Sequence, residues 1–273
     1  MDYELDRDTH VERAEDGRYR TTISDGWSIG NAPNGGYLSV IAVKCIGALL
    51  PQPDPFSVTT HFLATARPGP AQVLVEVVRE GKGHSTGMAR MIQEDREILR
   101  TIAIFGDLTR TGGPTHVTAT PPSLPAPELC ERGRAGPTTA LSIADRVDVA
   151  MRPGDVSWMP SPDGTPRAHS NSPELAGWVA FRDGRPIDTT SLVFLADAMP
   201  PPVLNLEAVR TPWVPTLELT VHVRARPAPG RIAARFTTRA LMNGYLEEDG
   251  ELWDSRGTLV AMSRQLARVQ RTS

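Results

Sequence analysis

The chain has 273 residues, of which 40% are hydrophobic and 22% are charged, and this composition is typical of a folded globular protein. The formal net charge of −3 argues against a nucleic-acid surface, and no apolar run approaches the ~20 residues that a membrane span requires. The first ten residues are polar and acidic, so we expect no secretory signal and predict a cytoplasmic protein. Cys45 and Cys130 fit that compartment and are expected to be core or incidental thiols.

The N-terminal part of the chain predicts one strand, one buried helix and four further strands. The alternating segment Arg18–Ile23 favours a strand. Turn-forming residues 31–36 precede a mostly apolar run, Tyr37–Leu50, and Pro51 follows it, a pattern typical of a buried helix. Four short runs separated by turn-forming residues then predict antiparallel strands at 57–65, 72–80, 85–93 and 98–105.

Residues 111–138 are dominated by Pro, Gly and Thr without a sustained period, and they predict a linker. After this segment the pattern of the first part returns. A second apolar helix is expected from Thr190 to Met199, ended by Pro200-Pro201-Pro202. Strands are expected around it at 176–182, 214–226, 231–242 and 258–269.

Two short patterns recur in both parts of the chain. Ala66–Pro70 lies between two predicted strands, and a similar segment reappears between two others as Ala225–Pro229. Aligning the two predicted helices places Val43 opposite Asp197. This self-similarity suggests two copies of one unit, in which an antiparallel sheet wraps around a helix.

Asp197 is a charged residue in an otherwise apolar helix. A carboxylate there loses hydration and lies near the unfavourable C-terminal end of the helix dipole, so we expect its pKa to be raised. Because Val43 holds the equivalent position, the fold does not need a carboxylate there, and a chemical role is favoured. The structural alternative is a carboxylate paired with an arginine such as Arg210 or Arg224.

Four features of the sequence resemble the double hot-dog acyl-CoA thioesterases, and the similarity spans nearly the whole chain. They are Asn34-Gly35-Gly36 at the start of the first helix, the Ala-Arg-Pro-Gly turn at 66–69, the segment Arg79–Ser85 and the Pro-rich crossover. The resemblance implies an α+β fold of two fused units, each a curled antiparallel sheet wrapped around a central helix. The expected domains are an N-terminal hot-dog at 1–110, the linker at 111–138 and a C-terminal hot-dog at 139–273.

The second half is also similar to the thioesterase II group, which uses an aspartate, a threonine and a glutamine to hold a hydrolytic water. In this sequence Asp197, Thr216 and Gln265 match those three positions. The prolines that follow Asp197 depart from the pattern, because the helix would be expected to continue there.

Strand alternation treats the threonine and the glutamine differently. Gln265 lies on an uncharged face of its predicted strand and should point toward the helix, although a glutamine bonded to backbone at a sheet edge is the alternative. Thr216 shares parity with Glu218 and Thr220, so it should face away from the core unless it lies at the mouth of the strand.

Three more residues are candidates for substrate binding. The backbone N–H groups of Gly36 and Tyr37, at the start of the first helix, are candidate donors to the thioester oxyanion, with tight packing of the helix as the alternative. His84 lies beside Ser85 in a Gly-rich loop and is a candidate ligand contact, although such a residue is more often a solvated loop histidine.

The sequence therefore predicts an acyl-CoA thioesterase with Asp197 as base, water as nucleophile, one active site per chain, no metal and no cofactor. The expected substrate is a fatty acyl-CoA, and exposed sheet edges allow a homo-oligomer. The alternative is a hot-dog protein that binds acyl-CoA or acts as an assembly partner without catalysis. A hot-dog hydratase is disfavoured, because the sequence offers no Asp-to-His pair at the spacing that this chemistry would use.

Overall fold

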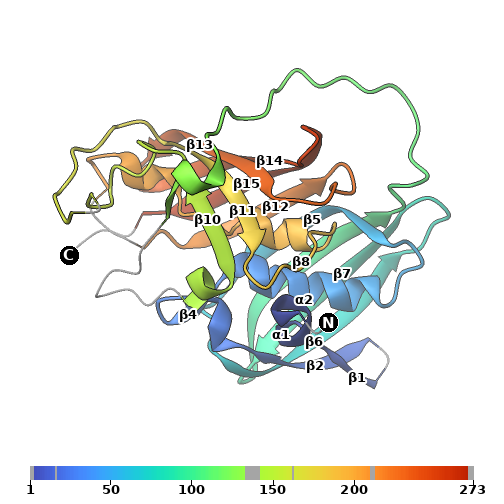
Figure 1. Ribbon diagram of the computed structural model, residues 1–273. Coiled ribbons are helices and arrows are strands. Elements are labelled where there is room, and N and C mark those ends of the chain that lie inside the picture. Colours follow the sequence, from blue (N-terminus) through green and yellow to red (C-terminus); the bar gives the residue numbers. More distant parts are fainter. Residues whose placement is uncertain (1–2, 16, 133–141, 162, 210–212, 270–273) are drawn as a thin grey trace.

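A computed structural model describes residues 3–15, 17–132, 142–161, 163–209 and 213–269. These residues form mostly strands, with few helices (Figure 1). Their α-helices are α1 (Glu4–Asp8), α2 (Gly35–Gly47) and α3 (Ser191–Leu195). The strands of the first half are β1 (Glu12–Glu15), β2 (Arg18–Ile23), β3 (Ser28–Ile29), β4 (Ala32–Pro33), β5 (Asp54–Phe62), β6 (Gly69–Arg79), β7 (Ser85–Gln93) and β8 (Arg96–Gly106). Those of the second half are β9 (Glu131–Arg132), β10 (Val147–Met151), β11 (Glu174–Phe181), β12 (Thr216–Val223), β13 (Ile232–Met242), β14 (Tyr245–Trp253) and β15 (Leu259–Arg268).

One antiparallel sheet of 13 strands runs through both halves of the chain in the order β1-β2-β6-β7-β8-β5-β12-β15-β14-β13-β11-β10-β9. Strands β5 and β12 pair at its centre, where Val58 lies opposite Val221. Read outward from this pair, the first half follows β5-β8-β7-β6-β2 and the second half follows β12-β15-β14-β13-β11. The two halves therefore have the same strand order around a common centre.

Helix α2 is buried and packs against strands β5, β6, β7 and β8 and against α3. Its start is fixed by Asn34, whose side chain accepts a hydrogen bond from the backbone N–H of Tyr37. The apolar residues Val40, Ile41 and Ile46 are fully enclosed, because the helix is apolar on nearly all sides and the sheet covers it.

Helix α3 is much shorter than the sequence predicted. It ends at Leu195, and the chain then turns through Asp197 before a 3-10 helix at Pro202–Asn205. The prolines from 200 onward prevent a helix from continuing past Met199, but α3 ends earlier, where Asp197 contacts Asn34 and Gly36 at the start of α2. A long central helix in the second half was therefore the wrong expectation, and Asp197 lies just beyond the helix that was expected to contain it.

The predicted strands are present with shifted ends, but the short strands β1, β3, β4 and β9 and the longer strands β10 and β14 were not expected. The acidic residues of β14 obscure the alternation of apolar and polar side chains that predicts a strand. In the structure Leu246, Glu248 and Leu252 are buried. The stronger signal was the turn before it, where Asn243 and Gly244 have φ of 54° and 84° and join β13 to β14. An Asn-Gly pair between two strands is a frequent hairpin turn, because both residues tolerate positive φ.

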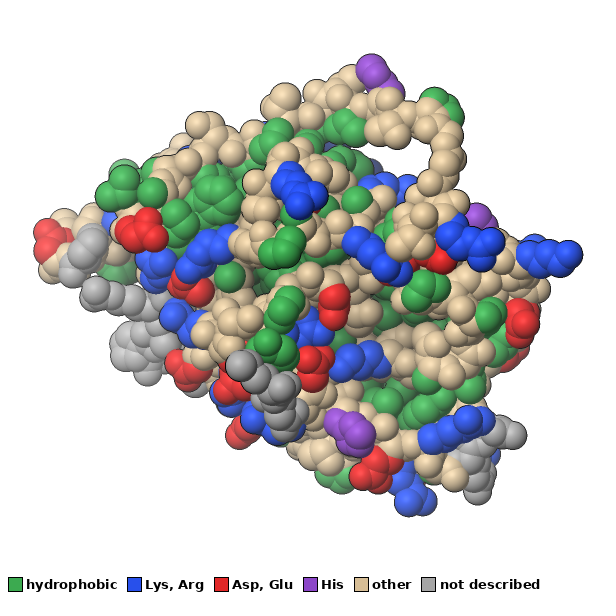
Figure 2. Space-filling view, turned by 45° about the vertical axis from the view of Figure 1, so that its right-hand side comes forward, with side chains coloured by type: hydrophobic (Ala, Val, Ile, Leu, Met, Phe, Trp, Pro, Cys, Tyr) green, Lys and Arg blue, Asp and Glu red, His purple; other side chains and the backbone are tan. Residues whose placement is uncertain are grey.

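The segment predicted as a linker runs along the outside of the molecule. Residues 107–126 form an arch that stands away from the sheet in Figures 1 and 2. Near its end Pro125 accepts a hydrogen bond from the Trp178 side chain, and β9, which lies inside the predicted linker, pairs with β10. Figure 2 also shows positive and negative side chains interspersed on this face.

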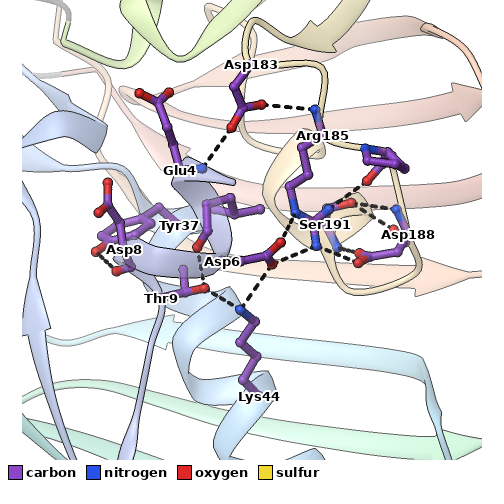
Figure 3. A network of polar contacts seen from close by, with 12 residues as sticks. Glu4, Asp6, Asp8, Thr9, Tyr37, Lys44, Asp183, Arg185, Asp188 and Ser191 are labelled. Atoms are coloured by element: carbon purple, nitrogen blue, oxygen red, sulfur yellow. Dashed lines mark hydrogen bonds and ion pairs between the residues drawn. The ribbon is translucent and has the colours of Figure 1, made fainter. Parts of the chain in front are cut away.

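A network of charged side chains fixes the N-terminal helix to the rest of the protein (Figure 3). Arg185 is only 9% exposed, and its guanidinium binds both Asp6 and Asp188. Lys44 of α2 donates to Thr9 at 2.5 Å and also faces Asp6. These bonds tie α1, α2 and the segment before α3 together.

No helix among the described residues combines the length and the apolar character needed to cross a membrane. Cys45 and Cys130 are both buried and unpaired. Burial raises the pKa of the Cys45 thiol to about 12, which is the behaviour of a core thiol.

Candidate functional site

Asp197 contacts the N-terminus of α2, the helix of the other half. Its Oδ2 accepts a hydrogen bond from the backbone N–H of Gly36 at 2.8 Å and another from the Asn34 side-chain amide at 3.0 Å. The same Asn34 amide donates to the backbone carbonyl of Asp197 at 2.8 Å. Asn34 therefore holds both the start of its own helix and the carboxylate that lies against it.

This close approach depends on Gly36 having no side chain. A Cβ at this position would lie 2.9 Å from the carbonyl oxygen of Phe194 and 2.9 Å from the Cβ of Asp197. Such distances are too short for any other residue, so the first turn of α2 can meet the segment after α3 only with glycine here. The exposed N–H groups of a helix start also favour a negative charge.

The ionisation of Asp197 reflects two opposing effects. Burial raises its pKa to about 6, and hydrogen bonds from Gly36, Asn34 and Gly35 lower it without cancelling that effect. The raised pKa was predicted from the sequence, but the helix dipole that acts on this carboxylate is the favourable end of α2. A half-buried carboxyl with a pKa near neutrality is suited to accept a proton.

The Arg224 guanidinium, one of the two proposed ion-pair partners of Asp197, donates instead to the carbonyl of Phe56. Arg210, the other proposed partner, lies outside the described residues.

Thr216 and Gln265 contact each other directly. The Thr216 hydroxyl donates to Oε1 of Gln265 at 3.0 Å, and Gln265 is only 6% exposed. Strand parity had placed Thr216 on the outer face, but a bulge changes its direction. Thr216 and Glu218 lie opposite the consecutive residues Ala267 and Leu266 of β15, so their side chains leave opposite faces of the sheet.

Asp197, Thr216 and Gln265 line one pocket of about 300 Å³, together with Asn34 and Gly35. The remaining lining is mostly apolar and comes from both halves of the chain: Ile29, Ala32, Pro33, Leu38, Phe62, Leu63, Ala64, Thr65, Ala66, Met199, Pro201, Trp213, Val214, Pro215 and Leu217. The structure thus brings all three predicted catalytic residues to a single apolar cavity between the halves.

Gly36 and Tyr37 lie beside this group, but their N–H donors have partners within the chain. The Gly36 N–H binds Asp197, and the Tyr37 N–H binds the Asn34 side chain at 2.9 Å. The Tyr37 side chain does not line the pocket, and its hydroxyl donates to the carbonyl of Asp8 (Figure 3). Burial raises the pKa of that hydroxyl to about 12, so it remains a neutral donor.

His84 is not brought to the same group. Its ring packs edge-on against Phe56, with 5.3 Å between centroids, at the start of β5. It lines a separate, open surface pocket with Gln52, Lys82 and Arg110, near the opposite end of the α2 helix from Asp197. In the described parts of the chain, His, Cys, Asp and Glu residues form no group of three or more that could hold a metal ion.

The sequence did not assign roles to two residues of this region. Asn34 was expected at the start of the first helix, but its side-chain role was not predicted, although its position before Gly35-Gly36 and an apolar run is a typical N-cap signal. Glu248 was missed because β14 was missed. It is 5% exposed and lies opposite Gln265 in the sheet, where an alternating strand would normally carry an apolar residue.

Comparisons with known proteins point to one family. The model of an acyl-CoA thioesterase N-terminal domain matches residues 23–106, and the model of an acyl-CoA thioesterase C-terminal domain matches residues 121–269. A solved structure of a proposed thioesterase II from Thermobifida fusca is 33% identical, with 98% of each chain covered and a TM-score of 0.87.

Two other similar proteins have no established function. A hot-dog protein of unknown function from Alicyclobacillus acidocaldarius superposes with a TM-score of 0.84 at 20% identity, with 99% of each chain covered. An uncharacterised protein from Mycobacterium tuberculosis is 24% identical over 268 residues, which cover 90% of this chain and 89% of the relative. The first of these similarities supports the fold, and neither adds a substrate.

Proposed function

Because this chain belongs to the acyl-CoA thioesterase family, we propose that it hydrolyses a fatty acyl-CoA to a free acid and coenzyme A, with a water molecule activated by Asp197. The observation that carries the proposal is the pocket between the halves. It combines a carboxyl group whose pKa is raised to about 6 with an amide and a hydroxyl in an otherwise mostly apolar lining.

The hydrogen bonds of Asp197 suggest how it would act. Those from Gly36 and Asn34 both end on Oδ2, so we assign Oδ1 as the oxygen that accepts a proton from water. Oδ2 then serves to hold the carboxylate in place, with the helix start stabilising its charge. This use of Gly36 differs from the oxyanion role expected from the sequence, which would require its N–H to exchange Asp197 for the substrate.

Hydrolysis would proceed without a covalent enzyme intermediate. Water donates one hydrogen bond to Asp197 and the other to Oε1 of Gln265, and its lone pair attacks the thioester carbonyl carbon as its proton passes to Asp197. The carbon–sulfur bond then breaks, and the departing thiolate takes up that proton to give the thiol of coenzyme A. Thr216 supports this arrangement by holding the Gln265 oxygen at 3.0 Å.

The apolar lining supports an acyl group as the part of the substrate that enters the pocket. Leu38, Phe62 and Met199 surround the space next to Asp197, and each offers surface to a hydrocarbon chain. The coenzyme A moiety would then extend outward past the rim. His84 lines a separate pocket, and its proposed contact would be with the distal end of the ligand.

We further propose that the chain is a fused pair of hot-dog units, with residues 1–110 and 139–273 as the two units and 111–138 as the linker. The matching strand order on either side of β5 and β12 supports this division. Since Asp197 occurs only in the second unit and Val43 aligns with it in the first, one active site per chain follows.

Thiol release from acyl-CoA esters of graded chain length tests this proposal, with wild type and Asp197→Asn compared. The asparagine still accepts a hydrogen bond from Gly36, so the fold should persist while kcat falls about 10²- to 10⁴-fold, the usual contribution of a general base. Equal rates for the two proteins would contradict the role of Asp197.

The pH dependence offers a second measurement on the same proteins. Asp197 must be ionised to act, so the wild-type rate should fall about tenfold per pH unit below its pKa of about 6. Because that pKa is raised, ionisation of Asp197 favours the unfolded chain as pH rises from 3.8 through about 6. Asp197→Asn should therefore melt at the same temperature as wild type or higher at pH 8.

One observation favours a second candidate, a non-catalytic acyl-CoA-binding protein. Asp197 already satisfies two donors of the Asn34–Gly36 segment, so it could serve the structure alone. In that case no acyl-CoA ester would be hydrolysed by the wild type, binding of an acyl-CoA would be measurable, and Asp197→Asn would lower stability instead of activity.

A further inference from the structure

Glu248 is a buried carboxyl group directly behind the candidate site. It lies on β14, where it pairs with Gln265 of β15, and its side chain points to the inner face of the sheet with 5% of the residue exposed. Its neighbours Glu247 and Asp249 point to the outer face, where Asp249 binds Arg264 and Arg239. A glutamate at an inner position of a strand has a large desolvation cost and calls for an explanation.

The Gln265 side chain connects Glu248 to the pocket. Its Oε1 accepts a hydrogen bond from Thr216, and a second side-chain hydrogen bond links Gln265 to Glu248. Since Oε1 faces the threonine, the amide nitrogen is the atom that meets the glutamate. The amide is therefore held at both ends, with its oxygen toward the pocket and its nitrogen toward β14.

The other oxygen of Glu248 is unusual. Its Oε2 is buried and has no hydrogen-bond partner among the described residues, and the buried hydroxyl of Thr238 also has none there. Thr238 belongs to a bulge of β13 that lies opposite Glu248, between the paired residues Thr237 and Ala240. A carboxyl oxygen so enclosed is poorly suited to carry negative charge.

The charged groups that act on Glu248 are both acidic. Burial raises its pKa well above the usual range, and the negative charges of Asp197 and Asp249 act in the same direction, while the hydrogen bond from Gln265 lowers it. Gln265 on β15 and Thr238 on β13, the polar residues beside it on the adjacent strands, are uncharged. Burial and the negative charge of Asp197 therefore both favour the neutral form of Glu248.

We propose that Glu248, in its neutral form, is a positioning residue for the hydrolysis proposed above: it holds the Gln265 amide so that Oε1 faces Thr216 and the water. The inference rests on that proposed function. A water that attacks a carbonyl must donate both its hydrogens and keep a lone pair for the carbon. A flipped amide would offer N–H to the water and engage that lone pair, so the orientation of Gln265 decides whether the water is productive.

The neutral form of Glu248 would also favour hydrolysis for a second, electrostatic reason. The transition state of hydrolysis carries negative charge on the thioester oxygen, and a second anion behind Gln265 would oppose it. Activity should therefore fall as the pH rises through the raised pKa of Glu248 and this group loses its proton. Because Asp197 and Glu248 interact, the two limbs of the expected pH profile belong to the pair.

Substitutions of Glu248 with matched controls at Glu247 test the proposal. Glu248→Gln remains neutral and keeps an acceptor for the Gln265 amide, so kcat at pH 7 should stay within about twofold of wild type, and the fall in activity that accompanies loss of the Glu248 proton should disappear. Glu248→Met removes the acceptor without changing the volume much, so kcat should fall about 10- to 100-fold with KM nearly unchanged. Glu247→Gln and Glu247→Met, on the exposed face of the same strand, should match wild type in every measurement.

An NMR measurement separates this proposal from the proposed function. The side-chain NH₂ signals of Gln265, identified by their loss in Gln265→Met, should shift and exchange faster with solvent in Glu248→Met and remain near their wild-type values in Glu248→Gln. If the wild type hydrolyses no thioester, the proposed function fails, and these signals still decide whether Glu248 orients Gln265. Unchanged signals in Glu248→Met, or equal kcat and pH profiles in all variants of an active enzyme, would overturn the inference.

Discussion

The two halves of the sheet carry different side chains at equivalent positions next to its centre. Thr60 of β5 lies opposite Leu219 of β12. Moving outward in the first half, Thr60 pairs with Thr101, which pairs with Ala89. Moving outward in the second half, Leu219 pairs with Gln265, which pairs with Glu248. The same two steps thus lead to a threonine and an alanine on one side, and to a glutamine and a glutamate on the other.

At these positions the buried polar side chains of the first half are neutral hydroxyls. Thr101 and Thr60 share a hydrogen bond of 2.9 Å, and the Ser39 hydroxyl of α2 donates to the carbonyl of Gly35 at 2.8 Å and lies 3.1 Å from the Thr60 hydroxyl. In the second half the corresponding region holds two carboxyl groups with raised pKa values, Asp197 and Glu248. Since one architecture accepts both solutions, the ionisable set is not required by the fold, which favours a chemical role for it.

The largest contrast is expected between Gln265 and its equivalent, Thr101. Gln265→Met should lower kcat about 10- to 100-fold, because the water loses one of its two acceptors and Glu248 loses its donor. Thr101→Val should leave kcat unchanged and cost about 1 kcal/mol of stability, the net worth of one hydrogen bond. Steady-state kinetics would give kcat and chemical denaturation would give the stability of both variants. Equal effects on kcat would contradict a catalytic role confined to the second half.

The next largest effect is expected from a substitution of Gly36, where the start of α2 contacts the segment after α3. Gly36→Ala places a Cβ 2.9 Å from the Phe194 carbonyl oxygen, so the segment that holds Asp197 must shift. We expect a loss of about 1–3 kcal/mol and a fall in kcat of about tenfold, in keeping with the cost of overpacking and of misplacing a catalytic group.

The control is Gly47→Ala at the other end of the same helix. Its Cβ would lie 3.1 Å from the Phe105 ring, which is a side chain that can adjust, and it lies away from Asp197. Stability should change by less than about 1 kcal/mol, with kcat as in wild type. If Gly36→Ala behaves like this control in melting and kinetic measurements, the contact between the start of α2 and the segment after α3 does not position Asp197.

The smallest effect is expected at Thr216. Thr216→Val keeps the shape of the side chain and removes the hydroxyl that holds Oε1 of Gln265, so kcat should fall about threefold while Glu248 still holds the amide. Thr220 on the same strand bonds Thr59 across the outer face, and Thr220→Val should have no effect on kcat. The measurement is kcat at saturating acyl-CoA, and a larger effect at Thr220 would contradict the direction assigned to Thr216.

The sequence predicted much of the fold and the composition of the site. Hydrophobic periodicity and turn residues marked α2 and most strands of the sheet, because these signals are local. It missed β14, whose inner face includes Glu248, and extended α3 too far because an apolar run does not reveal where tertiary contacts end a helix. The chain order of Asp197, Thr216 and Gln265, with the family resemblance, indicated the residues that the structure brings together in one pocket.

The sequence alone determined that a carboxylate stands in an apolar segment of the second half and that the first half has Val43 in its place, since both follow from pattern and alignment. Only the tertiary structure decided what surrounds it. The start of α2 brings Asn34 and Gly36 to Asp197, the bulge of β12 turns Thr216 inward, and the register of β14 and β15 puts Glu248 behind Gln265. These contacts join residues far apart in the chain, and their directions depend on register and packing, which a local sequence pattern does not specify.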